Sequence, residues 1–388
     1  MKTQVAIIGA GPAGLLLARL LARHGIESVV VESRSRDYIE SRVRAGVIEA
    51  NTVRLLEEVG AAAGVRAEGI VHDGTALRFD GRTHRLDLLD LVGRGITIYP
   101  QQKVVRDLVT AQLAAGDPIL FETKALHVDG LLGPEPTVTI ERDGRREKIS
   151  CRFVIAADGF HGIGRAAAPA GDLTVYERDY PYKWLALMVE TPPPSHELIY
   201  ASHERGFTLL SMRTPTVSRI YLQVPMDEDA EQWSTDRIWS ELHLRTGDGE
   251  PVPLREGPIT QRSTIHLRSF VAAPMRYGNL FLAGDAAHIV PPTGAKGLNL
   301  AAADVAVLSE ALRQYFKSDD GAGLEAYSDT CLRRVWQVER FSAWITYALH
   351  RAPEPFDQMV NLASLRHIVE NRAAAVSFAE NYTGLPLM

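Results

Sequence analysis

The chain has 388 residues, 46% hydrophobic and 23% charged, which is typical of a globular protein long enough for two domains. Its net charge of −6 at pH 7 provides no basic field and argues against nucleic acid or a membrane as a partner. Cys151 and Cys331 are too few for a disulfide framework and lack CxxC spacing, which favours the cytoplasm. We find no signal peptide or membrane span.

The N-terminal elements are predicted in the order strand, turn, helix, strand. Residues 5–8 form a buried strand, and the turn Gly9-Ala10-Gly11-Pro12-Ala13-Gly14 leads into a helix over residues 15–24. A second buried strand, residues 29–31, ends in Glu32. This order predicts a parallel, right-handed βαβ unit.

The remaining chain predicts a second unit inserted into the first. The expected elements are short strands within 71–100, a helix at 102–115, a hairpin at 138–149, a buried strand at 153–157, an antiparallel sheet from about 182 to 223, a returning strand at 281–283, a helix at 298–316 and mostly helix after 324. We therefore expect an α/β fold: a Rossmann-like domain interrupted in sequence, an inserted antiparallel-sheet substrate domain and a helical C-terminal region. The predicted bounds are 1–71, 99–180 and 268–323 for the first domain, 72–98 and 181–267 for the second, and 324–388 for the helical region.

The glycine-rich turn has the spacing of a dinucleotide-binding loop. Gly9, Gly11 and Gly14 allow a pyrophosphate to approach the backbone at a helix N-terminus, which favours negative charge. Glu32, at the end of the next strand, has the position of an acid that accepts hydrogen bonds from ribose hydroxyls. An acid there repels a 2′-phosphate, so the site suits FAD or NAD; the alternative is a glycine-rich turn without a ligand.

A second motif lies about 270 residues downstream, at Gly284-Asp285. Binding from both ends of a long chain indicates a large two-part cofactor such as FAD, because a plain nicotinamide dehydrogenase has no use for the second motif. Two further segments are ambiguous on their own. Arg42 and Arg44 suit phosphates or form a solvated basic turn, and Asp158-Gly159 is either a tight turn or a cofactor contact.

Together these motifs resemble the three fingerprints of the single-component FAD-dependent aromatic hydroxylases. Within that family the chain is most similar to the members that hydroxylate 4-hydroxybenzoate, along nearly all its length. The matching stretches are residues 42–47, 158–162, 195–200, 282–302 and 380–386. The resemblance implies that 4-hydroxybenzoate is hydroxylated at the 3-position to 3,4-dihydroxybenzoate, through a flavin C4a-hydroperoxide formed with O2 and NAD(P)H, in the catabolism of aromatic acids. It implies no protein metal.

The resemblance also assigns the substrate site. It implies that Ser211, Arg213 and Tyr221 form a carboxylate clamp on the inserted sheet. Without the resemblance, the spacing of these residues favours polar side chains on the solvent face of a strand. At the phenol end it implies a proton relay from Tyr200 through Tyr382 to His72 as the outlet to solvent. Imidazole ordinarily titrates near 6.5, so such a relay suits neutral pH. Pro292 would accept from the substrate hydroxyl, and the resemblance implies that Thr293 also binds the substrate.

The remaining implied roles concern the cofactor and the electron donor. The implied FAD contacts are Gly9, Gly11, Gly14, Glu32, Arg42, Arg44, Gln102, Asp158, Arg219, Gly284, Asp285, Lys296, Leu298 and Asn299, with Arg219 linked to flavin movement. Lys296 and the helix start near Leu298 would favour the anionic reduced flavin. The implied nicotinamide contacts are Arg34, Tyr38, Arg42, Arg44 and His161. They favour NADPH, although Ser33 departs from the pattern of strict NADPH users and leaves NADH open.

The resemblance further implies a homodimer formed in part by the C-terminal helices. Of three alternative functions, one stays open, one is disfavoured and one is excluded. A hydroxylase of another carboxylated phenol stays open because pocket volume is not visible in sequence. An FAD-binding protein without turnover is disfavoured by the intact relay and clamp. A flavin disulfide reductase is excluded, because Cys151 and Cys331 lack the close spacing of a redox pair.

Overall fold

The computed structural model describes residues 1–44 and 46–387, so Ala45 of the segment 42–47 lies outside the described residues. Its first body is built on a mixed sheet in the order β18-β19-β12-β1-β2-β8. These strands are Arg276–Tyr277, Leu280–Leu282, Phe153–Ala156, Val5–Ile8, Ser28–Val31 and Ile119–Leu120. All neighbours are parallel except β18 and β19. The predicted βαβ unit is confirmed, since β1 pairs in parallel with β2.

The second body is built on an eight-stranded sheet in the order β20-β17-β13-β16-β15-β14-β5-β6. Its strands are His288–Ile289, Ile259–Ala273, Thr174–Val189, Val217–Pro225, Thr208–Thr214, Ile199–Ala201, Gly74–Phe79 and Arg82–Asp87. Two three-stranded sheets accompany the large ones. They are β11-β10-β9 (Arg145–Ser150, Thr137–Arg142, Lys124–Asp129) and β3-β7-β4 (Val47–Glu49, Ile96–Ile98, Ile70–His72).

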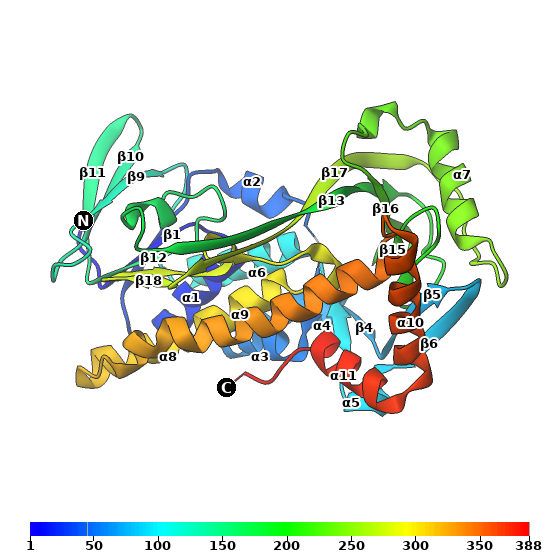
Figure 1. The fold of residues 1–388 in the computed structure, drawn as a ribbon. Helices are drawn as coiled ribbons and strands as arrows, with labels where there is room; N and C mark the ends of the chain where they lie inside the picture. Colours follow the sequence, from blue (N-terminus) through cyan, green and yellow to red (C-terminus); the bar gives the residue numbers. More distant parts are fainter. Residues whose placement is uncertain (45, 388) are drawn as a thin grey trace.

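Helices cover both bodies (Figure 1). They are α1 (Pro12–Arg23), α2 (Arg36–Ser41), α3 (Ala50–Glu58), α4 (Ala63–Glu68), α5 (Leu88–Val92), α6 (Gln101–Ala114), α7 (Thr235–Thr246), α8 (Gly297–Ser318), α9 (Ala322–Leu349), α10 (Pro355–Glu370) and α11 (Arg372–Thr383). The short 3-10 turns are η1 (Arg165–Ala167), η2 (Ala230–Gln232), η3 (Gly284–Ala286) and η4 (Pro292–Gly294). The mixed α/β architecture with a helical C-terminal region is thus as predicted. Among the described helices, none combines the length and apolar character that a membrane crossing requires.

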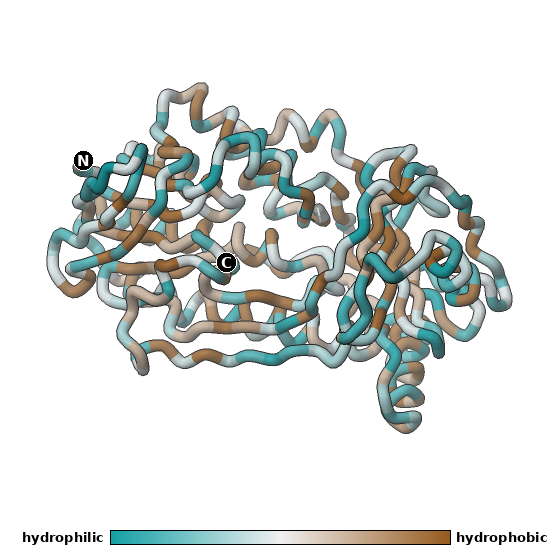
Figure 2. Tube along the Cα trace, turned by 90° about the horizontal axis from the view of Figure 1, so that it is seen from above, coloured by the Kyte–Doolittle hydropathy of each residue, from teal (hydrophilic) through white to brown (hydrophobic). Residues whose placement is uncertain are grey.

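Two long strands, β13 and β17, run from one body into the other (Figure 1). Seen from above, hydrophobic stretches run along the strands of both bodies (Figure 2). The sheet begins earlier than the predicted residue 182, because β13 already starts at Thr174. The domain boundaries predicted at 180/181 and 267/268 fall inside these strands, where the register shifts between Asp179 and Lys183. The division into domains stays a prediction.

Candidate active site

The glycine loop brings three separate segments together at the start of α1. A Cβ at Gly14 would overlap the Gly9 carbonyl oxygen, so this glycine allows helix and strand to pack closely. Gly9 has φ +103°, and a Cβ there would overlap the backbone of Ala157. Gly11, by contrast, faces open space. The loop therefore leaves its backbone accessible at the N-terminus of a 12-residue helix, where an anion is favoured.

Glu32 shapes this loop from the neighbouring strand. Its Oε2 accepts from Ala10 N at 2.8 Å and its Oε1 accepts from Arg34 N at 2.8 Å, and the residue is buried. A carboxylate has about four lone-pair sites, so acceptor capacity remains for ribose hydroxyls. The predicted ribose role stays a proposal.

The downstream motif packs directly on the glycine loop. Gly284 has φ +61°, and a Cβ there would lie 3.4 Å from the Ala13 Cβ and 3.2 Å from the Ala301 Cβ. Its N–H donates to Asp304 Oδ2 at 3.0 Å, and the same oxygen lies 2.6 Å from His288 Nε2. The two motifs, far apart in sequence, therefore meet at one place.

Sequence reasoning missed Asp304. A signal for it exists: it is an acid on the buried face of α8, among Leu300, Ala301, Val305 and Leu308. A charged residue at apolar helical positions requires a partner, and here the partners are the Gly284 N–H and His288.

Asp285 follows Gly284 in the downstream motif and lies near Arg44 and Arg42. Its side chain is solvent-exposed, yet surrounding protein desolvates it and raises its pKa, while His288, Arg44 and Arg42 act in the opposite direction. Burial likewise lowers the pKa of Arg44, with Arg42 and Asp285 as the nearest charges. Both predicted arginines therefore lie beside Asp285.

Asp158 is held within its own turn. Its Oδ2 accepts from Gly164 N at 2.8 Å, and burial raises its pKa. Its Oδ1 and the Oε1 of Gln102 are buried oxygens without a hydrogen-bond partner in the described part of the chain. Such atoms are costly unless a ligand or water satisfies them. With the open backbone at Gly11 and the accessible Asp285, they fit a dinucleotide cofactor.

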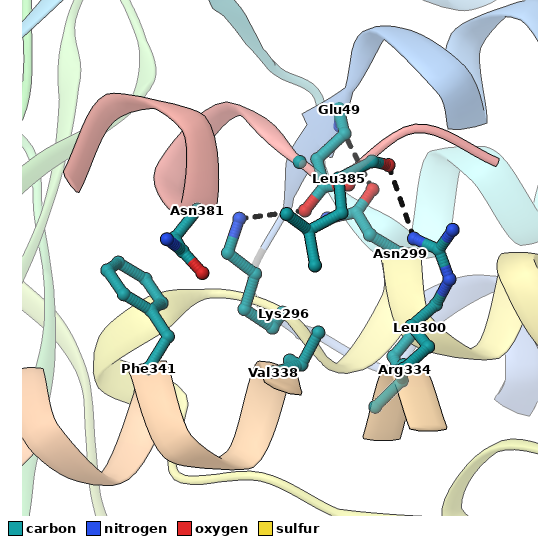
Figure 3. A pocket seen from close by; sticks show the side chains of 10 residues that line it. Glu49, Lys296, Asn299, Leu300, Arg334, Val338, Phe341, Asn381 and Leu385 are labelled. Atoms are coloured by element: carbon teal, nitrogen blue, oxygen red, sulfur yellow. Dashed lines mark hydrogen bonds and ion pairs between the residues drawn. The ribbon is translucent and has the colours of Figure 1, made fainter. Parts of the chain in front are cut away.

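The predicted flavin end is centred on Lys296 (Figure 3). Lys296 Nζ lies 2.7 Å from Glu49 Oε1 and 2.6 Å from the Tyr382 carbonyl oxygen. Asn299 Oδ1 accepts from Glu49 N at 2.9 Å and from Thr52 Oγ1 at 2.8 Å. The positive charge of Lys296 is thus paired rather than free, and α8 begins beside it at Gly297, before Leu298. Sequence reasoning missed Glu49, because its partner is 247 residues away.

The predicted clamp lies on one face of the large sheet. Leu209 of β15 is opposite both Tyr200 of β14 and Tyr221 of β16, and Ser211 is opposite Arg219 in the next row. Side chains two residues apart share a face, so all of these point the same way. The Ser211 hydroxyl donates to the Arg219 carbonyl oxygen at 2.7 Å, so its proton is already engaged.

Arg219, which is buried, and Arg213, which is half-buried, form a positive region. Burial lowers the pKa of Arg213, with Tyr221 raising it and Arg219 lowering it, and the Arg219 guanidinium lies 5.1 Å from the Tyr221 ring centre. Both Nε atoms lack a hydrogen-bond partner within the described ranges. Neither arginine forms an ion pair with any described Asp or Glu. Buried charge without a counterion fits an anionic ligand.

The predicted relay residues are brought together in part. The Tyr200 and Tyr382 hydroxyl oxygens are 3.1 Å apart, and burial raises the pKa of both phenols. His72 is buried, with neither ring nitrogen bonded to a described residue. Burial lowers the pKa of His72 from its ordinary value near 6.5 to about 4, so the imidazole is neutral at pH 7. Its role as the outlet of the relay stays a prediction.

The loop that carries Pro292 and Thr293 packs against helix α9. The Pro292 carbonyl accepts from Ala295 N at 2.9 Å, which leaves one lone pair free. Thr293 is buried, and its hydroxyl oxygen lies 2.9 Å from that of Thr346.

The predicted nicotinamide contacts lie on the surface. Arg34, Tyr38, Arg42, Arg44 and His161 are all exposed, and the Arg34 guanidinium stacks 5.2 Å above the Tyr38 ring. Arg42 and Arg44 lie near Asp285, and Tyr38 is close enough to Arg44 to influence its pKa. His161 instead packs edge-on against Phe160.

Comparison with known proteins places the chain in a family. Residues 2–342 match the family model described as "FAD binding domain". A p-hydroxybenzoate hydroxylase from Acinetobacter baylyi is 46% identical over 389 residues, covering 100% of this chain and 96% of that protein. A 3-(3-hydroxy-phenyl)propionate/3-hydroxycinnamic acid hydroxylase from Mycobacterium sp. (strain JLS) is 27% identical over 87% of this chain and 57% of its own length.

Solved structures agree on the fold. A p-nitrophenol 4-monooxygenase from Pseudomonas putida DLL-E4 has a TM-score of 0.82 over 99% of both chains, at 19% identity. The chain therefore belongs to the FAD-binding domain family and, within it, to the FAD-dependent aromatic hydroxylases. FAD is its cofactor.

The glycine loop gives a prediction with a built-in control. Replacing Gly14 with Ala forces a Cβ onto the Gly9 carbonyl and should cost about 1–3 kcal/mol of unfolding free energy. Replacing Gly11 with Ala meets open space, so protein stability should change by less than about 0.5 kcal/mol while FAD affinity falls. Urea unfolding of the FAD-free proteins and FAD titration separate the two effects. Equal destabilisation by both substitutions would contradict this account.

His72 gives a pH prediction. In the unfolded chain it takes up a proton near pH 6.5, whereas in the folded protein its pKa is about 4. The folded state then binds fewer protons, so stability falls as pH drops. Relative to His72→Asn, the wild type should lose about 2 kcal/mol between pH 7 and pH 5 in urea unfolding of the FAD-loaded proteins. A difference that does not vary with pH would show that His72 titrates in the folded protein as it does in the unfolded chain.

Proposed function

We propose that the chain hydroxylates 4-hydroxybenzoate at the 3-position to 3,4-dihydroxybenzoate, using O2 and NADPH, in aromatic acid catabolism. The observation that carries the substrate class is the half-buried Arg213, which has no ion-pair partner among the described residues and adjoins Tyr221. Tyr221 shares a sheet face with Tyr200, which pairs with Tyr382. One end of the site thus suits a carboxylate and the other a phenol. The named Acinetobacter relative supports the same choice.

The residues of the chain have distinct proposed roles. Arg213 and Tyr221 bind the carboxylate, joined by Ser211 once its hydroxyl turns away from the Arg219 carbonyl. The Pro292 carbonyl and the Tyr200 hydroxyl contact the phenol oxygen. Because burial raises the pKa of Tyr200 and Tyr382, both stay protonated and can exchange protons with the substrate without ionising. His72, neutral at pH 7, ends the relay as an acceptor.

The overall reaction needs a two-electron donor and one O2. NADPH is oxidised, one oxygen atom enters the ring carbon next to the phenol oxygen, and the other leaves as water. FAD, when bound, supplies the transfer of electrons from the nicotinamide to O2. Arg42, Arg44 and the exposed Arg34, Tyr38 and His161 are proposed to bind the nicotinamide nucleotide, with NADPH favoured and NADH open.

We also propose a cytoplasmic homodimer. Both cysteines are free and buried, which suits a reducing compartment. The C-terminal helices carry the large exposed apolar side chains Phe356, Met359 and Val360 of α10, at 78%, 58% and 48% exposure, and Trp336 of α9. Such residues on neighbouring helices support an interface there.

The proposed reaction has a direct test. NADPH oxidation by the FAD-loaded protein in air should rise strongly when 4-hydroxybenzoate is added, with 3,4-dihydroxybenzoate as the product by chromatography. Repeating the assay with NADH determines the donor. Stimulation without that product means that the site serves another carboxylated phenol. An absence of stimulation with FAD bound would contradict the proposed function.

The clamp has a separate prediction. Arg213→Gln should weaken 4-hydroxybenzoate binding to the oxidised holoprotein about 10- to 100-fold, because a charge-assisted hydrogen bond is worth roughly 1.5–3 kcal/mol. Binding of phenol, which lacks the carboxylate, should change little. Arg237→Gln, at an exposed arginine paired with Glu228, is the matched control. If phenol and 4-hydroxybenzoate weaken equally, Arg213 does not bind the carboxylate.

A further inference from the structure

Helix α9 carries a buried polar stripe that the proposed chemistry does not use. Ser342 and Thr346 lie one turn apart, and His350 follows at the C-terminal cap. Ser342 and Thr346 are 0% exposed and His350 is 1% exposed. Thr346 and His350 have hydrogen-bond partners, as such buried polar groups require, whereas the Ser342 hydroxyl has none among the described residues.

At one end the stripe supports the loop η4. The hydroxyl oxygens of Thr346 and Thr293 are 2.9 Å apart. A Cβ added at Gly294 would lie 2.9 Å from Ser342 Oγ, so the helix packs tightly against the next loop residue as well. Thr293 therefore cannot retreat from the substrate side unless a buried hydrogen bond breaks.

At the other end the stripe supports the clamp sheet. His350 Nδ1 lies 2.7 Å from the Thr346 carbonyl oxygen, and His350 Nε2 accepts from Trp184 Nε1 at 2.7 Å. The indole N–H can only donate, which fixes the hydrogen on Nδ1. The Trp184 ring centre lies 5.0 Å from that of Tyr221, and its strand is paired with the strand of Tyr221.

A continuous buried path thus joins the two sides of the proposed substrate site: Thr293, Thr346, His350, Trp184 and Tyr221. We propose that Thr346 and His350 are positioning residues that fix the spacing between the loop η4 and the carboxylate clamp. In this way they select substrates by the distance between phenol oxygen and carboxylate. The inference rests on the proposed function, which places Tyr221 and Pro292, the neighbour of Thr293, beside the substrate.

The physical argument concerns selectivity rather than affinity. A ligand one carbon longer fits only if η4 or the clamp sheet moves. That movement breaks the buried hydrogen bond between Thr346 and Thr293. A ligand of the correct length meets no such cost. When the bond is already absent, the cost for the longer ligand disappears, so discrimination falls while binding of the correct ligand changes less.

The test compares Thr346→Val, which removes the hydroxyl at nearly constant shape, with Thr346→Ser, which keeps it. Dissociation constants of 4-hydroxybenzoate and 4-hydroxyphenylacetate are measured by calorimetry on the oxidised, FAD-loaded proteins. In Thr346→Val, the preference for the shorter ligand should fall about fivefold, equivalent to about 1 kcal/mol. It should stay within about twofold of wild type in Thr346→Ser.

Trp184→Phe, which removes the donor to His350, is the second variant and should lower the preference in the same direction. Thermal unfolding of each variant checks that it is folded. Equal weakening of both ligands, or an unchanged preference in Thr346→Val and Trp184→Phe, would overturn the inference alone. A wild type that binds neither ligand would overturn the proposed function and the inference together.

Discussion

The ion pair between Lys296 and Glu49 is the contact on which the arrangement of the site depends most. Lys296 also donates to the Tyr382 carbonyl, so one ammonium group joins β3, the start of α8 and the end of α11. All three groups are buried, which makes the pairing strong and the loss of either partner costly. The same contact fixes the backbone of Tyr382, the relay tyrosine, relative to the cofactor side of the site.

The long strands β13 and β17 explain how substrate chemistry and cofactor chemistry meet. Their outer ends extend the sheet that carries the clamp, and their inner ends pack with the first body. Because β16 pairs with β13 along eight residues, the position of Tyr221 is fixed relative to the body that binds FAD. The helix α9 packs on the clamp face of the same strands, where His350 accepts a hydrogen bond from Trp184.

The sequence predicts local features well and distant contacts poorly. The strand–turn–helix at Gly9 to Gly14 is set by its own residues, since Gly14 is required by the close approach of Gly9. The pairing of Tyr200 with Tyr382 spans 182 residues, and only the family resemblance suggested it. The burial of His72 and the acid opposite Lys296 were not predictable, because each depends on which distant segments cover it. Asp304 was also missed, although its position as an acid on an apolar helix face could have indicated a buried, paired carboxylate.

Burial and ion pairing decide which groups of the site carry a charge at pH 7. Burial raises the pKa of Tyr200 and Tyr382 and lowers that of His72, so all three stay neutral at pH 7. Lys296 is balanced by Glu49, whereas Arg213 has no carboxylate partner among the described residues. In a buried site an uncompensated positive charge is stabilised by a negative ligand. A bound phenol that carries a carboxylate therefore supplies the missing charge, and neutral tyrosines at its other end are donors suited to a developing phenolate.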